Sequence, residues 1–282
     1  MSEEFFDRNK KVDTLKHYLK SKCFYKKNVL MTGATGAIGS KVLEKLLACD
    51  ANVVALIKDK NNLSAYLNDY LEKGVFNFEV IDLTMGMKIT EQFKKAMMKL
   101  GGKLDILILC HGKFTFGNLE DIKIKEFDEN ININVRANIH LLSLSVPFLK
   151  LTKGNVVMIS SVESNIVERG DFLHSISKNM INSLVQNSAL ELASFGVRIN
   201  AVAPGFVSTK LRVGEKLDEN KNTEYLQQMK GYCLLEDIST SDDISDAILF
   251  LASDEANFMT GEIMTIDSGF ELNHDLSFKA NY

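Results

Sequence analysis

Three side chains of the kinds that move protons and donate hydrogen bonds are spaced for a shared site. His174 and Lys178 are four positions apart, so they lie one turn apart on one face if the stretch is helical. Ser161 precedes the histidine by thirteen residues and ends an apolar run. Acid–base chemistry needs a group suited to proton transfer at neutral pH beside a hydrogen-bonding partner. These residue types and their spacing indicate that kind of chemistry.

A glycine-rich turn, residues 32–39, is a second chemical signal. It follows an apolar run at residues 28–31 and opens a helical pattern from Ala37, with glycine at positions 33, 36 and 39. In that context glycines permit a tight turn and let backbone N–H groups approach a pyrophosphate at the positive end of the helix. The turn predicts dinucleotide binding. The alternative is that the glycines only ease the packing of strand against helix.

Length, composition and charge are those of an ordinary globular chain. The 282 residues, 45% hydrophobic and 25% charged, are enough to bury the core of one large α/β domain. The net charge is -4 and the 33 Lys and Arg residues are spread through the chain, so no basic surface for nucleic acid is indicated. We therefore expect no nucleic-acid partner.

The cysteines and the N-terminal residues exclude further classes. The cysteines at positions 23, 49, 110 and 233 show neither metal-ligand spacing nor a disulfide framework, so no metal site is expected. The chain begins with acidic residues, no apolar signal segment follows, and no run approaches the roughly 18 apolar residues that span a bilayer. We expect a cytoplasmic protein without a membrane span, with an organellar location left open.

Short apolar runs alternate with helical patterns from residue 27 onward, and helical patterns also fill residues 127–150, 173–195 and 241–252. The apolar runs are continuous, which is typical of strands covered on both faces, and they fall at residues 28–31, 52–57, 78–81, 104–110, 155–159, 198–202 and 262–266. The second strand is expected to lead into one helix that runs through Leu71. The pattern predicts an α/β fold with a doubly wound parallel sheet of about seven strands, a Rossmann fold with three αβα layers.

Two segments are expected along the chain. Residues 1–26 are polar and Lys-rich, with apolar side chains at helical spacing, which indicates an N-terminal helical extension. It is interpreted as a surface extension, with partner binding as the alternative. Residues 27–282 contain no repeat or low-complexity tract and are expected to form a single domain.

Several motifs resemble those of the short-chain dehydrogenase/reductase (SDR) family. The turn at residues 32–39 is similar to the family's TGxxx(A/G)xG pattern, and residues 204–209 and 250–269 resemble its nicotinamide turn and its last helix and strand. The likeness spans about residues 27–270. It implies a nicotinamide dinucleotide site formed by Gly33, Thr35, Gly36, Ile38, Gly39, Lys58, Asp82, Leu83, Gly112, Lys178, Pro204, Gly205, Val207 and Thr209.

The end of the second strand bears on the choice of cofactor. In SDR enzymes an acidic side chain near this position holds the adenosine ribose of NAD, and here the residue is Ile57. Lys58 matches a position at which a basic residue meets the 2′-phosphate of NADP. The resemblance therefore favours NADP over NAD, the alternative being an ordinary surface lysine at a strand end.

The fourth strand ends in a departure from the family pattern. SDR enzymes usually read Asn-Asn-Ala-Gly where this chain has Leu109, Cys110, His111 and Gly112, so only the glycine matches. A Cys-His pair suggests a nucleophile or a ligand, but a buried thiol and a loop imidazole are the favoured interpretation. Residues 210–236 correspond to the family's variable substrate lid and indicate no particular substrate.

The resemblance assigns catalytic roles to Ser161, His174, Lys178 and Asn134. Ser161 would orient a substrate carbonyl, Lys178 would bind the nicotinamide ribose, and Asn134 would support a proton-relay water. The family's proton donor is a tyrosine at the position of His174. Imidazole reaches less far than phenol, and the Lys178 ammonium favours its neutral form, which is a poor acid. A water that bridges His174 and the substrate would overcome the short reach of the imidazole. Alternatively, the neutral imidazole would act as a base in alcohol oxidation.

Two functions follow from the histidine. The first is an NAD(P)(H)-dependent SDR oxidoreductase that acts on a carbonyl or secondary alcohol of a small-molecule substrate, with weakened proton transfer. The alternative is a catalytically inactive pseudoenzyme, a nucleotide-binding or structural subunit of a larger hetero-assembly. In the family, helices at about residues 128–150 and 174–195 pack against a second subunit, so the resemblance implies a homodimer or homotetramer.

Overall fold

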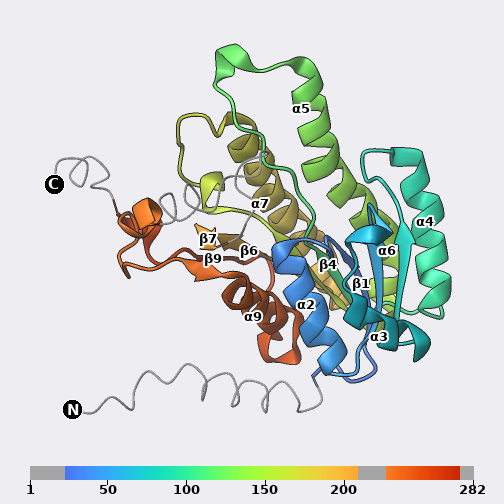
Figure 1. The fold of residues 1–282 in the computed structure, drawn as a ribbon. Helices are drawn as coiled ribbons and strands as arrows, with labels where there is room; N and C mark the ends of the chain where they lie inside the picture. The colour runs from blue at the N-terminus through green and yellow to red at the C-terminus, as the bar shows by residue number, and fades with distance from the viewer. Residues whose placement is uncertain (1–22, 209–226, 274–282) are drawn as a thin grey trace, which may run out of the picture.

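A parallel β-sheet is the central layer of the computed structural model, which describes residues 23–208 and 227–273 (Figure 1). Its seven strands lie in the order β3-β2-β1-β4-β5-β6-β9, and every neighbouring pair is parallel. This confirms the seven-stranded doubly wound sheet expected from the sequence. The strands are β1 Asn28–Thr32, β2 Asn52–Ile57, β3 Phe76–Val80, β4 Ile106–Leu109, β5 Asn155–Ile159, β6 Arg198–Pro204 and β9 Ile263–Ile266.

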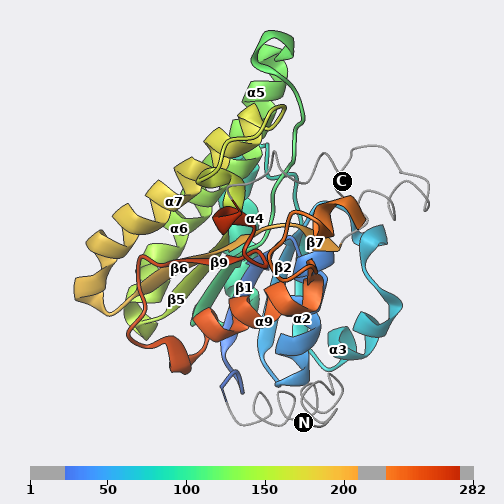
Figure 2. The ribbon, with the colours of Figure 1, turned by 90° about the vertical axis from the view of Figure 1, so that its left-hand side faces the viewer.

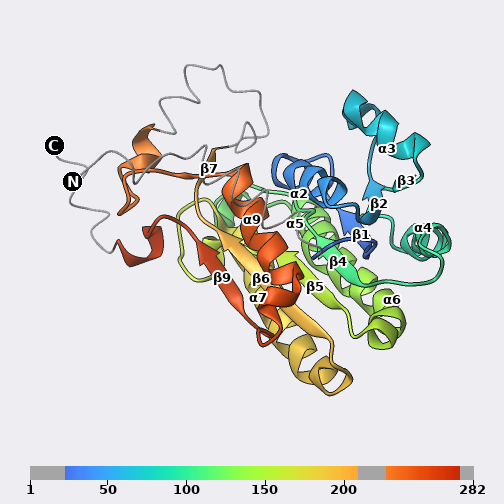
Figure 3. The same ribbon diagram turned by 90° about the horizontal axis from the view of Figure 1, so that it is seen from below.

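Helices cover both faces of the sheet (Figures 2 and 3). One face packs against α4, α6 and α7, and the other against α2 and α9. Leu30 of β1 belongs to the first core, whereas Val29 and Met31 belong to the second, which explains why the strands read as continuous apolar runs. The helix bounds are α2 Ala37–Ala48, α4 Gly86–Lys99, α5 Ile124–Ile131, α6 Ala137–Thr152, α7 Phe172–Leu192 and α9 Ser241–Ala252.

The connection between β2 and β3 differs from the single helix expected there. It is divided into the 3-10 helices η2 (Lys60–Asn62) and η3 (Ala65–Leu67) and the short α3 (Asn68–Glu72). The Asp59 carboxylate accepts a hydrogen bond of 2.9 Å from the backbone N–H of Asn61. Such local side-chain-to-backbone bonds compete with helical hydrogen bonds, which accounts for the break.

The long helical pattern over residues 127–150 is present but contains an irregular turn. A π-helical segment, η5 (Asn132–Arg136), joins α5 to α6. Single π turns inserted into helices are frequent at functional sites. At the end of α7, after the 3-10 helix η7 (Ala193–Phe195), Gly196 has a left-handed φ of 74°, a conformation in which glycine commonly ends a helix.

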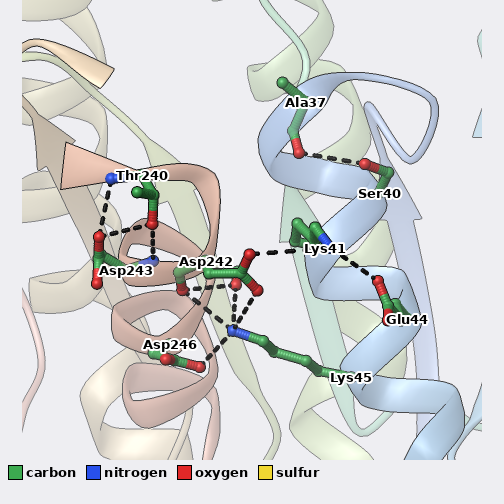
Figure 4. Close-up of polar contacts among 10 residues, drawn as sticks. Ala37, Ser40, Lys41, Glu44, Lys45, Thr240, Asp242, Asp243 and Asp246 are labelled. Carbon is green, nitrogen blue, oxygen red and sulfur yellow. Dashed lines mark hydrogen bonds and ion pairs between the residues drawn. The ribbon is translucent and has the colours of Figure 1, made fainter. Parts of the chain in front are cut away.

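Two lysines of α2 contact α9, which lies on the same face of the sheet, and Lys41 Nζ is 3.8 Å from Asp242 Oδ2 (Figure 4). Lys45 Nζ lies 2.7 Å from Ser245 Oγ and 2.5 Å from the carboxylate of Asp246. The first turn of α9 is capped by reciprocal hydrogen bonds between Thr240 and Asp243. The Lys45 contacts attach α2 to α9.

The N-terminal extension is only partly open to comparison. Residues 1–22 lie outside the described residues, so the helix expected there stays a prediction. Phe24 is fully buried and packs in the same core as α2 and α9. The hydrophobic core therefore includes a residue that precedes the first strand.

Candidate active site

The carboxyl ends of the strands meet at one edge of the sheet, where the strand order reverses between β1 and β4. Ligands of doubly wound proteins bind at such a switch point. The residues expected to bind a cofactor follow these strands: Gly33, Thr35, Gly36, Ile38 and Gly39 after β1, Lys58 after β2, Asp82 and Leu83 after β3, Gly112 after β4, and Pro204, Gly205 and Val207 at and beyond the end of β6. Thr209, also expected there, lies outside the described residues.

The glycine-rich turn has features that fit packing and features that fit an anion. Gly33 has a φ of 71°, and a Cβ on it would lie 2.5 Å from the carbonyl oxygen of Cys110. A Cβ on Gly39 would overlap the Gly33 carbonyl group. Gly36 is the N-cap of α2 and supplies no side-chain cap, and the first turn of that helix has no acidic residue. The positive end of α2 is therefore suited to a phosphate group, as a dinucleotide would require.

Lys58 and Asp82, expected at two different strand ends, lie together. Lys58 Nζ is 3.4 Å from Asp82 Oδ2, and the lysine side chain is 76% exposed. The backbone N–H of Thr84 donates to Asp82 Oδ1 at 3.0 Å. This hydrogen bond, with those of the Thr84 hydroxyl and Lys58, holds the pKa of Asp82 below its ordinary value. An ion pair thus borders the site at the ends of β2 and β3.

Lys178 on α7 is buried beside the loop that follows β4. Its Nζ donates a 2.8 Å hydrogen bond to the carbonyl oxygen of Ile159, and a Cβ on Gly112 would lie 3.5 Å from the same nitrogen. Burial lowers the pKa of Lys178 to about 8, against the opposing effects of Cys110 and Glu163. A buried ammonium group is costly, and groups with such strongly shifted pKa values are concentrated at functional sites.

Asn134 lies in the π turn η5 and joins two parts of the site. Its side chain accepts from the backbone N–H of Lys113 at 2.7 Å and donates to the Lys113 carbonyl at 2.9 Å. It also donates to Ser177 Oγ at 3.0 Å, one residue before Lys178. The backbone carbonyl of Asn134 accepts from the Asn138 side chain at 2.6 Å. Asn134 thus ties the loop after β4 to α7, while its relay role stays a prediction.

Ser161 follows β5 and caps the 3-10 helix η6 (Val162–Ser164). Its Oγ accepts from the backbone N–H of Glu163 at 3.3 Å, and its carbonyl accepts from the Ser164 hydroxyl at 2.6 Å. The Asn182 side chain on α7 donates to Ser164 Oγ at 2.8 Å and accepts from Ser160 Oγ. This buried polar chain holds η6 and Ser161 against α7, the helix that carries His174 and Lys178.

His174 contacts a carboxylate that the sequence analysis did not single out. His174 Nε2 lies 3.2 Å from Glu163 Oε2, with the two side chains 11% and 3% exposed. The ring of Phe114 lies 4.9 Å from the imidazole ring, centroid to centroid. The prediction of a neutral imidazole considered Lys178 alone. In the structure the Glu163 carboxylate opposes the effect of Lys178, because a nearby negative charge favours the protonated ring. The only signal for Glu163 in the sequence was its position two residues after Ser161. Its contact with His174 could not be predicted, because η6 and α7 meet only in the folded chain.

Two further acidic residues adjoin this contact. Glu163, Glu168 and Asp171 each have a carboxyl oxygen within 4.8 Å of the others. This side of the site is therefore rich in negative charge. The expectation that the chain holds no metal stays a prediction.

His111 lies in the loop after β4, as expected from the sequence. Its side chain is buried, at 8% exposure, and its Nδ1 lies 2.7 Å from the hydroxyl of Thr32. Burial, with a smaller effect of Lys178, lowers the pKa of His111 to about 4 against the opposing effect of the Ile133 carbonyl. His111 is thus a neutral link between β1 and the loop after β4. This contact forms because Thr32 is the last residue of β1, next to β4 in the sheet.

Cys110, expected to be a buried thiol, is half-buried. Desolvation raises the pKa of its thiol to about 12, so the reactive thiolate is not formed near neutral pH.

Among the residues that the structure describes, no helix is long and apolar enough to cross a membrane.

The fold defines a doubly wound Rossmann-type protein with a glycine-rich turn at the N-terminus of α2, Ser161 at the start of η6, and His174 and Lys178 on α7. The protein family described as enoyl-(acyl carrier protein) reductase matches residues 33–271. The chain belongs to the short-chain dehydrogenase/reductase family of oxidoreductases.

Relatives of known name match nearly the whole chain. Trans-4-hydroxycyclohexanecarboxylate dehydrogenase of Sinomonas cyclohexanicum is 30% identical over 250 residues, covering 86% of this chain and 92% of that protein. A 3-oxoacyl-(acyl-carrier-protein) reductase of Buchnera aphidicola is 29% identical over 245 residues, covering 86% and 97%. The structure of an SDR protein of unknown function from Caenorhabditis elegans, solved with cofactor, has a TM-score of 0.81 at 23% identity and covers 90% of this chain and 98% of that one. This last likeness supports the fold.

Proposed function

We propose that the protein is an NAD(P)(H)-dependent oxidoreductase that interconverts a carbonyl group and a secondary alcohol, with His174 in the position of the proton donor. When bound, the nicotinamide dinucleotide would supply or accept the hydride. The N-terminus of α2 would bind its phosphates, and Lys178 would bind its ribose. Ser161 would donate a hydrogen bond to the substrate oxygen, and His174 would exchange a proton with that oxygen directly or through one water.

The position of Lys178 is the observation that carries this proposal. Its ammonium group is buried between β5 and the Gly112 loop, where it costs stability, and the polar groups of Ser161 and His174 are presented from η6 and from the same helix. A purely structural role would not require a charge at this place. The relatives named as dehydrogenase and reductase support the same class of reaction.

Two substitutions at His174 test the proposed reaction. Phenylalanine removes the proton-transfer group and is expected to lower kcat for carbonyl reduction by about 10²–10⁴-fold, whereas tyrosine, the residue of the family pattern, is expected to keep or raise it. Reduction of a panel of dicarbonyls and cyclic ketones with NADPH and NADH is the measurement. If wild type and His174→Tyr are both inert on the whole panel, the pseudoenzyme subunit of a hetero-assembly becomes the better function.

NADP is the proposed preferred cofactor because Lys58 presents an exposed ammonium group at the end of β2, beside Asp82. Lys58→Ala is expected to raise the Kd for NADPH about tenfold, the equivalent of ~1.4 kcal/mol, and to leave the Kd for NADH nearly unchanged. Calorimetric titration of the two nucleotides measures this. Lys60→Ala, which removes a nearby exposed lysine, is the control. Equal effects of Lys58→Ala on both nucleotides would contradict the preference.

We propose a homodimer or homotetramer as the working form. Exposed apolar side chains lie on the helices that the family resemblance places at subunit contacts: Ile139 and Leu151 on α6, and Ile176 and Leu190 on α7. Burying such side chains against a second copy would remove apolar surface from water.

A further inference from the structure

We infer that Glu163 is a positioning residue for His174, and that its carboxylate holds the imidazole in the protonated form that donates a proton to the substrate. This inference rests on the proposed function above, since it explains how a histidine does the work of the family's tyrosine. It concerns a residue of this chain to which the family pattern assigns no role.

The contact joins two elements that are each held firmly. Glu163 lies in η6, which Ser161 caps and which the Ser164–Asn182 hydrogen bond attaches to α7. His174 lies in the first turn of α7, and its ring is packed against Phe114. The Nε2–Oε2 distance of 3.2 Å is therefore set by the fold rather than by two mobile surface chains. A carboxylate that is 97% buried is costly unless a positive group or a donor meets it, and His174 is such a partner.

The charges around the imidazole favour its protonated form. Glu163 approaches from η6, and Glu168 and Asp171, the N-cap of α7, each have a carboxyl oxygen within 4.8 Å of the Glu163 carboxyl group. The opposing cation is Lys178, one turn further along the helix, which itself feels the charge of Glu163. The Glu163 carboxylate, 3.2 Å from His174 Nε2, is the group that we expect to offset the effect of Lys178 on the imidazole. A carboxylate at hydrogen-bond distance stabilises imidazolium and fixes the ring orientation, as in other carboxylate–histidine pairs.

The proton transfer balances with the chemistry of the proposed reaction. A bound reduced nicotinamide dinucleotide would supply the hydride to the carbonyl carbon, the C=O double bond would become a C–O single bond, and its oxygen would take the proton of His174. The imidazolium would become neutral imidazole, with Nε2–H donating to Glu163, so that Nδ1, which is buried in this structure, would be the nitrogen that gives up the proton. Solvent then returns a proton to the ring. In alcohol oxidation the same proton moves in the opposite direction.

Titration of the histidine by NMR tests the pairing without a cofactor or turnover. The full chain, labelled with ¹⁵N, is compared as wild type and as Glu163→Gln, with the His174 signal assigned by its absence in His174→Asn. Glu163→Gln keeps the shape of the side chain and removes the charge. We expect the titration midpoint of His174 to fall by about one pH unit or more. Glu168→Gln removes one charge from the same acidic group and is expected to produce a smaller shift.

An unchanged His174 midpoint in a folded Glu163→Gln protein would overturn the inference, and so would equal shifts in Glu163→Gln and Glu168→Gln. The pH profile of carbonyl reduction gives a second readout. With a protonated donor, kcat falls as pH rises through the His174 midpoint, so in Glu163→Gln this fall is expected at lower pH, with KM little changed. If the His174 midpoint falls in Glu163→Gln as expected but neither protein turns over substrate, the proposed function is contradicted and the Glu163–His174 pairing is supported.

Discussion

Replacing Lys178 with methionine is expected to abolish turnover while making the protein less sensitive to pH. The substitution keeps the length of the side chain and removes the ammonium group next to Gly112 and Ile159. Loss of a preorganised charge in an active site lowers kcat by about 10²–10³-fold, and we expect at least this loss together with weaker nucleotide binding. Initial rates and calorimetric titration measure the two effects.

The pH effect follows from the buried ammonium group. The pKa of Lys178 is about 8 in the folded protein and 10.5 as its ordinary value. The unfolded chain therefore binds more protons between these values, so the free energy of unfolding rises with pH in that window. Between pH 7 and 10 the wild type should gain about 2 kcal/mol relative to Lys178→Met. Urea unfolding of the cofactor-free proteins at both pH values measures this difference.

Lys94→Met, at an exposed position of α4, is the control for the loss of a lysine. It should leave both turnover and the pH dependence of unfolding as they are in the wild type. Parallel unfolding curves for wild type and Lys178→Met across this pH range would contradict the assignment of a strained, buried ammonium group. Full activity of Lys178→Met would contradict its role in the site.

Acid sensitivity is expected to depend on His111. Its pKa is about 4 in the folded protein, below the ordinary value of 6.5, so the unfolded chain binds more protons between these values. The free energy of unfolding therefore decreases as pH falls through this window. From pH 7 to pH 5 the wild type should lose about 2 kcal/mol more than His111→Asn, which does not titrate there. At pH 7 the variant should be less stable, because it loses the packed ring and its contact with Thr32.

The measurement is urea unfolding at pH 7 and pH 5. His140→Asn removes another histidine–threonine contact, the 3.0 Å pair with Thr90, and shows what the loss of such a hydrogen bond does by itself. If wild type and His111→Asn lose the same free energy on acidification, His111 is not the neutral buried link described above.

The fold could be predicted because parallel strands with helices on both faces must be apolar on both faces. Leu30 faces one core and Val29 the other, so the run at residues 28–31 marks a strand without reference to any partner. The glycine turn could be predicted for a similar local reason, since only glycine accepts the conformation and contacts of position 33. The break in the β2–β3 connection was missed because the Asp59 side chain competes locally with helix formation.

The site could be predicted only in outline. The spacing of His174 and Lys178 on a helix follows from 3.6 residues per turn, and it is present on α7. The partners of these side chains were not predictable, because they come from other elements. Thr32 and His111 are 79 residues apart in the chain and meet only because β1 and β4 are neighbours.

The sequence by itself determined the Rossmann fold and the glycine-rich turn that opens α2, while phosphate binding there and a shared site of Ser161, His174 and Lys178 stay predictions. It did so because periodicity and glycine content are properties of single segments. The tertiary structure alone decided that His174 lies against Glu163, that Lys58 pairs with Asp82 and that His111 is buried. Which side chain meets which depends on how η6, α7 and the strand ends are packed, and periodicity shows the face of a residue but not the partner opposite it.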